Sequence, residues 1–395
     1  ALPGLADGGY PLARIAGLLL WAWLVWLAGS NGIAFSKMTI AAALGVVALV
    51  GAWQAWRQRD ALKKEWGRRW KLYLFIELLF LAFFLLDLVI RLGNPDLWHP
   101  SKGGERPMNF AQLNAILKST TFPPYDPWFA GGYINYYYFG EVIVGTPVKL
   151  LGIVPSIAFN FILPTLFAIV ATATFSVGYN LIKPRLPDSD RWSLKTDSWR
   201  LLTGFSASAV MVLLGNLGVV RLFILGFQRN AAPGGGIEGA NLLEKIWWTL
   251  KGFFPTLAGL PLPYSPGDWY WFASRIFPYP HDEFYEFPAF TFLWSDLHAH
   301  LIAYMLTILV IAWVISLLVS KAKWASKTDT ALGLFLGALV IGSLKPANTW
   351  DFYTYFVFGA TALFYALARY SKVDHIFPGL PDWVKRISLA AGAVV

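Results

Sequence analysis

Long apolar stretches alternate with short polar segments along most of the chain. A helix needs about 20 mostly apolar residues to cross the hydrocarbon core of a membrane. The pattern predicts membrane-spanning helices at residues 10–28, 38–56, 72–90, 157–182, 201–227, 291–320, 331–344 and 350–367. The last apolar stretch, 387–395, is too short to span, so we expect the chain to stop inside a helix and the total to be about nine spans.

Basic residues are concentrated in four of the polar segments. These segments are residues 57–71, 183–200, 321–327 and 369–386. Lys and Arg beside membrane spans favour the cytoplasmic side, and about nine spans place all four segments there. We therefore predict a multi-pass protein of the plasma (cytoplasmic) membrane, with two long extracytoplasmic loops at residues 105–140 and 228–290.

The largely apolar segment 136–153 does not fit a simple alternation of sides. Only an odd number of crossings can join the extracytoplasmic loop before it to the basic segment after it. The segment is short and contains the charged residues Glu141 and Lys149. We therefore expect an interfacial or re-entrant helix here, followed by a single crossing at residues 157–182.

The composition supports a membrane protein in contact with the lipid bilayer. Hydrophobic residues make up 56% of the chain and charged residues 14%, whereas soluble domains carry about 25% charged residues. The absence of cysteine excludes disulfides, thiolate metal sites and cysteine nucleophiles. The net charge of +9 comes from loops that set the topology, so we expect no nucleic-acid partner.

These patterns predict an all-α polytopic fold that forms a single integral membrane domain over residues 1–395. Residues 1–56 hold two N-terminal spans, and residues 57–182 hold a span, the first long loop and the next span. Residues 183–395 hold the remaining spans and the second long loop. We expect both long loops to carry interfacial helices.

The first long loop holds more functional groups than a connection needs. It contains the acids Glu105 and Asp126 and the tyrosine run Tyr136, Tyr137 and Tyr138. Long, aromatic-rich loops on a rigid scaffold are frequent sites of function. An interfacial plug, with its aromatic side chains among the lipid headgroups, explains the tyrosines well and the acids poorly.

Two polar groups surround the start of the span predicted at residues 291–320. In the motif SDLHAH, a helix would bring Asp296 and His300 to one face and turn His298 away. Such a pair suits a divalent metal (Mg²⁺ or Mn²⁺) or a buried hydrogen-bonded pair, and two ligands are too few to decide. The preceding group comprises His281, Asp282, Glu283 and Glu286.

The motif KPANTWD places charged residues in a short break between two predicted spans. Lys345, Asn348 and Asp351 fit an ordinary turn, because Pro and Asn favour turns. The cation and the carboxylate also suit an anionic ligand at the level of the headgroups. In the third predicted span, Asp87 and Arg91 stand four residues apart, and we expect them to form a helical ion pair.

Three sequence blocks carry a resemblance to a known family. They read FPPYDPWFAGGYINYYYFG, EFPAFTFLWSDLHAH and KPANTWDF. They resemble the signature blocks of the YYY-domain (chlor-archaeal) integral membrane proteins, over a region from about Arg91 to Tyr355. That family is in turn similar to the GT-C type glycosyltransferases, polytopic enzymes that take sugars from polyprenyl-phosphate donors on the outer face. The resemblance implies a GT-C-like fold with acidic catalytic residues in the first long outer loop.

One block departs from the family pattern. The sequence ERPMN here usually reads EKPMD in the family, so Asn109 stands where the family has an acid. If that acid is the general base, the resemblance implies an impaired chain. Glu105 and Asp126 then remain as the acids of the first long loop.

Two functions from different classes follow. The first is a glycosyltransferase in which Asp126 or Glu105 takes a proton from the acceptor while polyprenyl phosphate leaves the sugar. The second is a non-catalytic subunit of a larger membrane complex, favoured by Asn109 and by the 20 tryptophans.

The enzyme hypothesis assigns roles to further residues. Asp296 with His300 would position the substrate or hold the metal, with His298 as a third candidate ligand. Candidate phosphate-binding or substrate-binding residues are Arg106, Arg275, Lys345, Tyr136, Tyr137, Tyr138, Asn348, Asp351 and Glu286.

Overall fold

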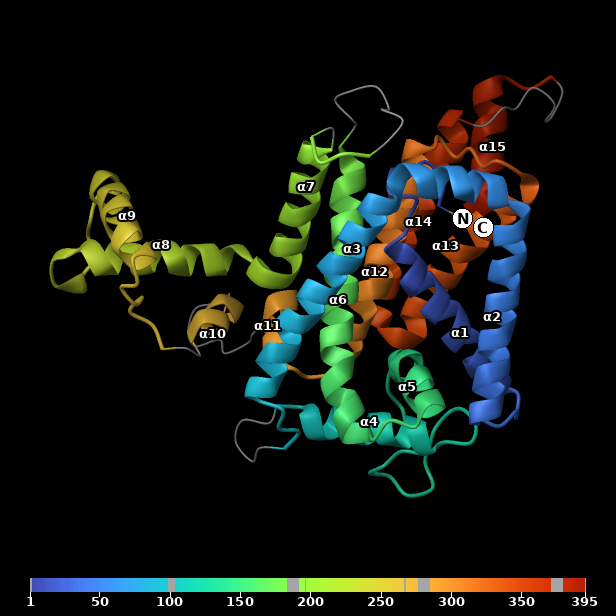
Figure 1. Ribbon diagram of the computed structural model, residues 1–395, viewed down its shortest axis with the longest axis horizontal. Helices are drawn as coiled ribbons and strands as arrows, with labels where there is room; N and C mark the ends of the chain where they lie inside the picture. Colours follow the sequence, from blue (N-terminus) through green and yellow to red (C-terminus); the bar gives the residue numbers. More distant parts are fainter. Residues whose placement is uncertain are drawn as a thin grey trace. The chain divides into compact units, whose positions relative to one another are not determined.

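The computed structural model describes residues 2–98, 104–182, 192–195, 197–265, 268–275, 285–370 and 379–394. Within these ranges the chain is helical, without strands apart from one isolated antiparallel bridge between Tyr125 and Tyr133. It divides into two compact units (Figure 1). We call Ala1–Ser208 with Ser295–Val395 the main unit, and Ala209–Trp294 the inserted unit.

The main unit is a bundle of long helices with shorter ones at its ends. Its helices are α1 (Leu12–Ser30), α2 (Lys37–Arg57), α3 (Arg59–Gly93), α4 (Arg106–Lys118), α5 (Phe139–Leu151), α6 (Pro155–Leu181), α7 (Ser198–Ala209), α12 (Ala299–Val319), α13 (Lys327–Ala347), α14 (Thr349–Tyr370) and α15 (Asp382–Val394).

Six helices of the described chain are long and apolar enough to cross a membrane. They are α1, α2, α3, α6, α12 and α13. A seventh span results if the bent pair Ser198–Leu214 and Leu217–Ala231 counts as one. The all-α, multi-pass prediction is therefore confirmed, whereas the count of about nine spans stays a prediction.

Helices α6 and α12 form the centre of the main unit. In their most apolar stretches, 78% and 72% of the residues are buried, against 6% in α2. Helix α12 packs against α6, α13, α14, α1 and α5. A helix that is apolar on all sides is stable where other helices surround it, while an exposed apolar helix such as α2 suits contact with lipid.

The two ends of the main unit differ in sequence. The α2–α3 junction, the α12–α13 connection and α15 lie at the upper end in Figure 1, and α4 and α5 lie at the lower end. The basic segments 57–71 and 321–327 therefore share the upper end, as their charge led us to expect. Their cytoplasmic location stays a prediction.

Two predicted elements of the main unit have a different extent in the structure. Helix α5 has 13 residues and ends at Gly152, whose φ of +69° reverses the chain. At 1.5 Å per residue it is about 20 Å long, too short to cross a membrane. The span predicted at residues 291–320 is broken, because α11 (Pro288–Trp294) ends before a non-helical linker and α12 begins at Ala299.

The inserted unit consists of α8 (Leu217–Ala231), α9 (Leu242–Leu257), α10 (Asp268–Ser274), α11 and short connecting turns. The span predicted at residues 201–227 is interrupted by Gly215, with a φ of +64°, and by Asn216, which caps α8. Helices α8 and α9 pack closely, because Gly252 leaves room for the backbone of Phe227.

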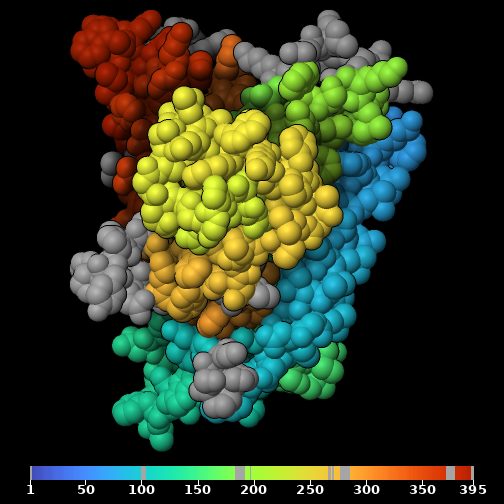
Figure 2. All heavy atoms as spheres, turned by 90° about the vertical axis from the view of Figure 1, so that its left-hand side faces the viewer, coloured from blue at the N-terminus to red at the C-terminus, as the bar shows by residue number. Residues whose placement is uncertain are grey.

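Helix α9 is amphipathic and exposes apolar side chains. Asn241 and Glu244 form a capping box that fixes its start. Leu243, Trp247 and Phe254 are exposed, and the yellow region of Figure 2 shows the surface that α8 and α9 form. Such a helix suits the plane of a membrane interface. Both long loops thus contain helices, α4 in the first and α9 in the second, whose interfacial position stays a prediction.

Candidate functional site

Four side chains from distant parts of the sequence meet at the lower end of the main unit. We call Glu105, Arg106, Asp296 and His298 the acid–histidine cluster. His298 Nδ1 lies 3.4 Å from Glu105 Oε2, and His298 Nε2 lies 3.5 Å from Asp296 Oδ2. Arg106 Nε lies 3.6 Å from Asp296 Oδ1, and the backbone N–H of Glu105 donates to Asp296 Oδ2 at 3.0 Å. The imidazole therefore lies between two carboxylates.

The ends of two helices position the cluster. Glu105 is the N-cap residue of α4, and His298 is the N-cap residue of α12. Ser295, with a φ of +65°, turns the linker between α11 and α12 so that Asp296 comes before the helix. The first N–H groups of a helix have no partner within it, so the start of α4 favours the nearby Asp296 carboxylate.

The cluster has a buried part and an exposed part. The side chains of Asp296 and Arg106 are 1% and 6% exposed, and their opposite charges compensate each other. Glu105, by contrast, is 56% exposed. Its carboxylate is therefore the group of the cluster that a substrate can reach.

The geometry corrects the interpretation of SDLHAH. Asp296 and His300 do not share a helix face, because α12 begins only at Ala299. His298, which a continuous helix would have turned away, contacts both acids, and the His300 ring stacks on it with centroids 5.1 Å apart. Within the described ranges no group of three His, Asp or Glu side chains could hold a metal ion. The Mg²⁺ or Mn²⁺ site therefore stays a prediction.

A buried polar layer lies beside the cluster. We use this term for Asn109 and Gln112 of α4 and Glu141 of α5. Asn109 and Glu141 are each 1% exposed. The two carboxyl oxygens of Glu141, Oδ1 of Asn109 and Oε1 of Gln112 have no hydrogen-bond partner among the residues described. Buried polar atoms are nearly always paired, so this layer is unusual.

The register of α4 against α5 places these groups at one level. Lys149 Nζ donates to the carbonyl of Ser119 at 2.7 Å, and Gly145 lies against Ile116, Leu117 and Leu113. One turn earlier on both helices, Glu141 comes to the stretch of α4 that holds Asn109 and Gln112.

The charge of His298 in the cluster affects the pKa of Glu141 in the buried polar layer. Burial raises the pKa of Glu141, on the short helix α5, to about 8, and the charge of His298 opposes this rise. The sequence analysis treats Glu141 only as a charge in a short apolar segment. A single acid within the apolar motif FGEVIVG was the feature of the sequence that could have indicated a buried carboxyl group.

The three tyrosines of the run have different surroundings. Burial, together with the charges of Glu105 and Glu141, raises the pKa of Tyr136. The Tyr137 ring lies against Tyr136, with centroids 4.8 Å apart. Tyr138 faces the bundle instead, where its hydroxyl accepts a hydrogen bond from Trp26. Tyr136 is therefore the member of the run that adjoins the cluster.

The α13–α14 corner adjoins the cluster through His300. Asn348 Nδ2 donates to Asp351 Oδ2 at 2.8 Å. Asp351 also lies close enough to His300 for their charges to interact. Lys345 is exposed, and its Nζ lies 5.8 Å from the centre of the Phe352 ring.

The predicted ion pair in the third span is wrong. Arg91 donates through Nε to Asn160 Oδ1 at 3.1 Å and makes a second hydrogen bond to the same atom. Both carboxyl oxygens of Asp87 have no hydrogen-bond partner in the described part of the chain. Asn160 on α6 is closer in space to Arg91 than the acid one helical turn away, and sequence spacing could not show this.

Two other predicted site residues have contacts of their own. Asp126 Oδ1 accepts hydrogen bonds from the backbone N–H groups of Trp128 and Phe129, at 2.8 and 3.1 Å, and so holds a turn. Arg275 lies 3.9 Å from the Trp271 ring within the inserted unit.

Two further predictions concern the second long loop. Glu286 of the inserted unit accepts a hydrogen bond from Thr291 at 3.0 Å. His281, Asp282 and Glu283 lie outside the described residues.

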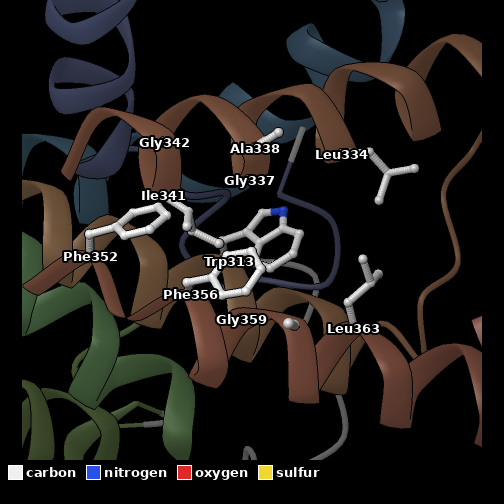
Figure 3. Close-up of a pocket in the computed structure, with 11 residues that line it drawn as sticks. Trp313, Leu334, Gly337, Ala338, Ile341, Gly342, Phe352, Phe356, Gly359 and Leu363 are labelled. Atoms are coloured by element: carbon white, nitrogen blue, oxygen red, sulfur yellow. The ribbon is translucent and has the colours of Figure 1, made fainter. Parts of the chain in front are cut away.

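An apolar cavity of about 360 Å³ opens between α12, α13 and α14. Figure 3 shows the Trp313 indole at its centre, with Ile341 and Phe352 towards one end and Leu334 and Leu363 towards the other. Gly337 and Gly359 allow the side chains of Trp313 and Ile341 to pack close to the backbones of α13 and α14. Phe352 also lies next to Lys345, so a cation stands near the end of the cavity that is closer to the acid–histidine cluster.

Comparisons with known proteins identify a family. Neither the curated proteins nor the solved structures include a match to this chain. A family model matches residues 20–395, nearly the whole chain. The chain therefore belongs to the family described as uncharacterized membrane protein (DUF2298).

Proposed function

We propose that the main unit is a GT-C type membrane glycosyltransferase that moves a sugar from a polyprenyl-phosphate donor to an acceptor on the extracytoplasmic face. The observation that carries this proposal is the exposed Glu105 carboxylate beside His298, whose second nitrogen faces the buried Asp296. A carboxylate held by an oriented imidazole is suited to accept a proton. Glu105 also lies in the first long loop, where the family resemblance expects catalytic acids.

The proposed reaction is a single displacement. Glu105 accepts the proton of an acceptor hydroxyl or amide as the acceptor atom bonds to the anomeric carbon of the sugar. The bond between that carbon and the phosphate oxygen breaks, and polyprenyl phosphate leaves with the electron pair. His298, flanked by two acids, compensates charge as the proton moves. Glu105 is preferred to Asp126 as the base, because Asp126 Oδ1 already accepts two backbone N–H groups.

The apolar cavity supports a lipid-linked donor. Its lining of Trp313, Ile341 and Phe352 suits an isoprenoid chain, and burial of each methylene contributes about 0.8 kcal/mol. Lys345 would then face the phosphate, near the surface of the bundle. Asp351 and His300 connect this corner to the acid–histidine cluster.

The test is sugar transfer by the purified chain in proteoliposomes. Radiolabelled sugars on polyprenyl phosphate are supplied as a panel, and transfer into a membrane extract is measured. Glu105→Gln should reduce the rate roughly 10²–10⁴-fold, the range of general-base assistance. Asp126→Asn keeps an acceptor for the turn and should change the rate less than about 10-fold. Glu244→Gln, an exposed substitution that preserves the capping box, is the matched control.

The outcome separates the enzyme from the alternative. If Asp126→Asn abolishes transfer and Glu105→Gln does not, the assignment of the base is wrong. If the wild-type chain transfers no sugar from any donor of the panel, the glycosyltransferase proposal fails.

A non-catalytic subunit is the second candidate, and two observations favour it. Asn109, at the position of a family acid, is a buried amide that cannot accept a proton as a base does. Helix α2 also exposes nearly its whole apolar surface, which suits a partner helix as well as lipid. Copurification of a stoichiometric membrane partner, together with a chain inactive towards every donor, would support this candidate.

A further inference from the structure

A second cavity lies on the side of α4 that faces away from the cluster. It has a volume of about 640 Å³ and lies between α4 and the turn that follows it. We call it the polar groove. The residues of its wall that matter here are Asn114, Lys118, Thr121, Tyr125, Asp126 and Tyr133. Its volume lies within the range of small-molecule sites, about 300–1,000 Å³.

Helix α4 separates the polar groove from the acid–histidine cluster. Ala111, Asn114 and Lys118 follow one another at intervals of three and four residues and share the face that lines the groove. Asn109 and Leu113 lie on the opposite, buried face. The groove is therefore a site of its own, with no residue in common with the cluster.

The opposite wall carries an exposed aromatic pair. The rings of Tyr125 and Tyr133 are stacked, with centroids 5.0 Å apart and planes 14° apart. Tyr125 is 64% exposed and Tyr133 is 54% exposed, although both could pack against protein in a loop of this length. Stacked phenol rings offer a flat apolar face bordered by hydroxyl groups.

The polar groups of the groove are arranged for hydrogen bonding and not for binding an ion. Asn114 Nδ2 donates to the carbonyl of Phe110, which leaves its Oδ1 as an acceptor. Asp126 holds the turn through Oδ1, so Oδ2 is available to a ligand. Lys118 offers three donors. One cation and one carboxylate balance in charge, which favours a neutral, polyhydroxylated ligand over a phosphate or a metal ion.

The wall formed by the turn is preformed by backbone hydrogen bonds. The N–H of Asp126 donates to the carbonyl of Gly132 at 2.9 Å, and the N–H of Ile134 donates to the carbonyl of Pro124 at 3.0 Å. Phe122 is buried, and its ring lies against Phe35 with centroids 5.0 Å apart. A wall held in this way gives up little conformational freedom when a ligand binds.

We propose that the polar groove binds a saccharide. The C–H face of a sugar ring would lie on the Tyr125–Tyr133 pair, and its hydroxyl groups would bond to Asp126, Asn114 and Lys118. An apolar chain would leave these polar groups without partners, which argues against a lipid tail. This binding does not depend on glycosyl transfer by the cluster.

The experiment measures the binding of soluble oligosaccharides to the full chain in lipid nanodiscs, since glycoside detergents would compete. The probes are oligomers of glucose, mannose, galactose and N-acetylglucosamine, with calorimetry and tryptophan fluorescence as readouts. Trp128 is exposed beside the turn and should report binding. At least one series should bind saturably. Tyr125→Ala and Asn114→Ala should each weaken it at least 10-fold.

The controls distinguish loss of the site from loss of the fold. Tyr353→Ala removes an exposed tyrosine of α14 and should leave binding unchanged. Tyr125→Ala could disturb the turn itself. Asn114→Ala changes a residue of helix α4 and leaves the turn intact, so it tests the groove without that effect. The proposal is overturned if no series binds to a chain with a normal melting temperature. It is equally overturned if binding survives both substitutions, or if the groove binds a proline-rich peptide and no saccharide.

Discussion

Glu141→Gln tests whether the buried acid beside the cluster carries a proton at neutral pH. Glu141 is 1% exposed, and neither carboxyl oxygen has a hydrogen-bond partner in the described ranges. Burial raises the pKa of this carboxyl from 4.5 to about 8. The folded protein therefore keeps a proton between pH 4.5 and pH 8 that the unfolded chain has already lost.

The sign of the pH effect follows from this difference. The folded state binds more protons than the unfolded state in this window, so stability falls as the pH rises from 4.5 to about 8 and is constant above. Between pH 6 and pH 9, stability is lost over the two pH units below the folded pKa of Glu141, which is about 8. At about 1.4 kcal/mol per unit, the loss is about 3 kcal/mol. For a chain of this size it lowers the melting temperature by roughly 3–4 °C.

The assay is the melting temperature of the wild type and the variant in micelles at pH 6, 7, 8 and 9, followed by tryptophan fluorescence. Glutamine has nearly the shape of the protonated acid and does not titrate, so the two proteins should agree at pH 6. The variant should exceed the wild type by roughly 3–4 °C at pH 9. The contributions of groups that titrate in both proteins cancel in the difference between the two melting temperatures. Glu244→Gln, an exposed substitution, should follow the wild type at every pH.

A difference between the two proteins that stays constant from pH 6 to pH 9 would refute the reasoning. Glu141 would then be ionised when folded, stabilised by a counter-charge or by water. In that case the buried polar layer would hold a negative charge beside His298, and the charge balance of the acid–histidine cluster would have to be revised.

Three further predictions concern packing, the polar layer and topology. Gly337→Ala should lower the free energy of unfolding by about 1–3 kcal/mol, because the new Cβ would overlap the indole ring beside it. In the control Gly342→Ala, the new Cβ meets nothing within 4 Å, so this change should be neutral or slightly stabilising. Asn109→Asp should lower the melting temperature, most strongly above pH 7, because it adds a second acid to the buried polar layer. In single-cysteine variants, Lys323→Cys should react with an impermeant reagent from the cytoplasmic side and Lys118→Cys from the other; labelling of both from one side would contradict the topology.

Much of the fold could be predicted because membrane spans follow directly from local composition. A run of about 20 apolar residues is both necessary and nearly sufficient for a spanning helix. The spans predicted at residues 10–28, 38–56 and 157–182 are helices of the structure. The break at Gly215 was missed because the stretch around it is largely apolar, and a positive φ leaves little trace in hydrophobicity. The break at Ser295 was missed because the polar motif SDLHAH was interpreted as part of a continuous helix.

The residues of the candidate site could be predicted from the sequence, but their pairing could not. Glu105, Arg106, Asp296 and His298 were all among the candidates, because charges near spans are rare and conspicuous. Their pairing was not predicted, since it depends on where α12 begins. The turn that Asp126 holds could not be predicted either, because a carboxylate that holds a turn looks the same in sequence as a catalytic one. Glu141 was undervalued, because its isolation became evident only from the burial of α5.

The amide at Asn109 is explained by its neighbour. Glu141 of α5 and Asn109 of α4 are both almost fully buried, and α4 packs against α5. The carboxyl oxygens of Glu141 and Oδ1 of Asn109 have no hydrogen-bond partner within the described part of the chain. An acid at position 109 would add a second buried carboxyl group to this layer, and an amide avoids that cost. In the proposed reaction, Asn109 would belong to an uncharged layer beside the cluster, and the exposed Glu105 would act as the base without an acid at position 109.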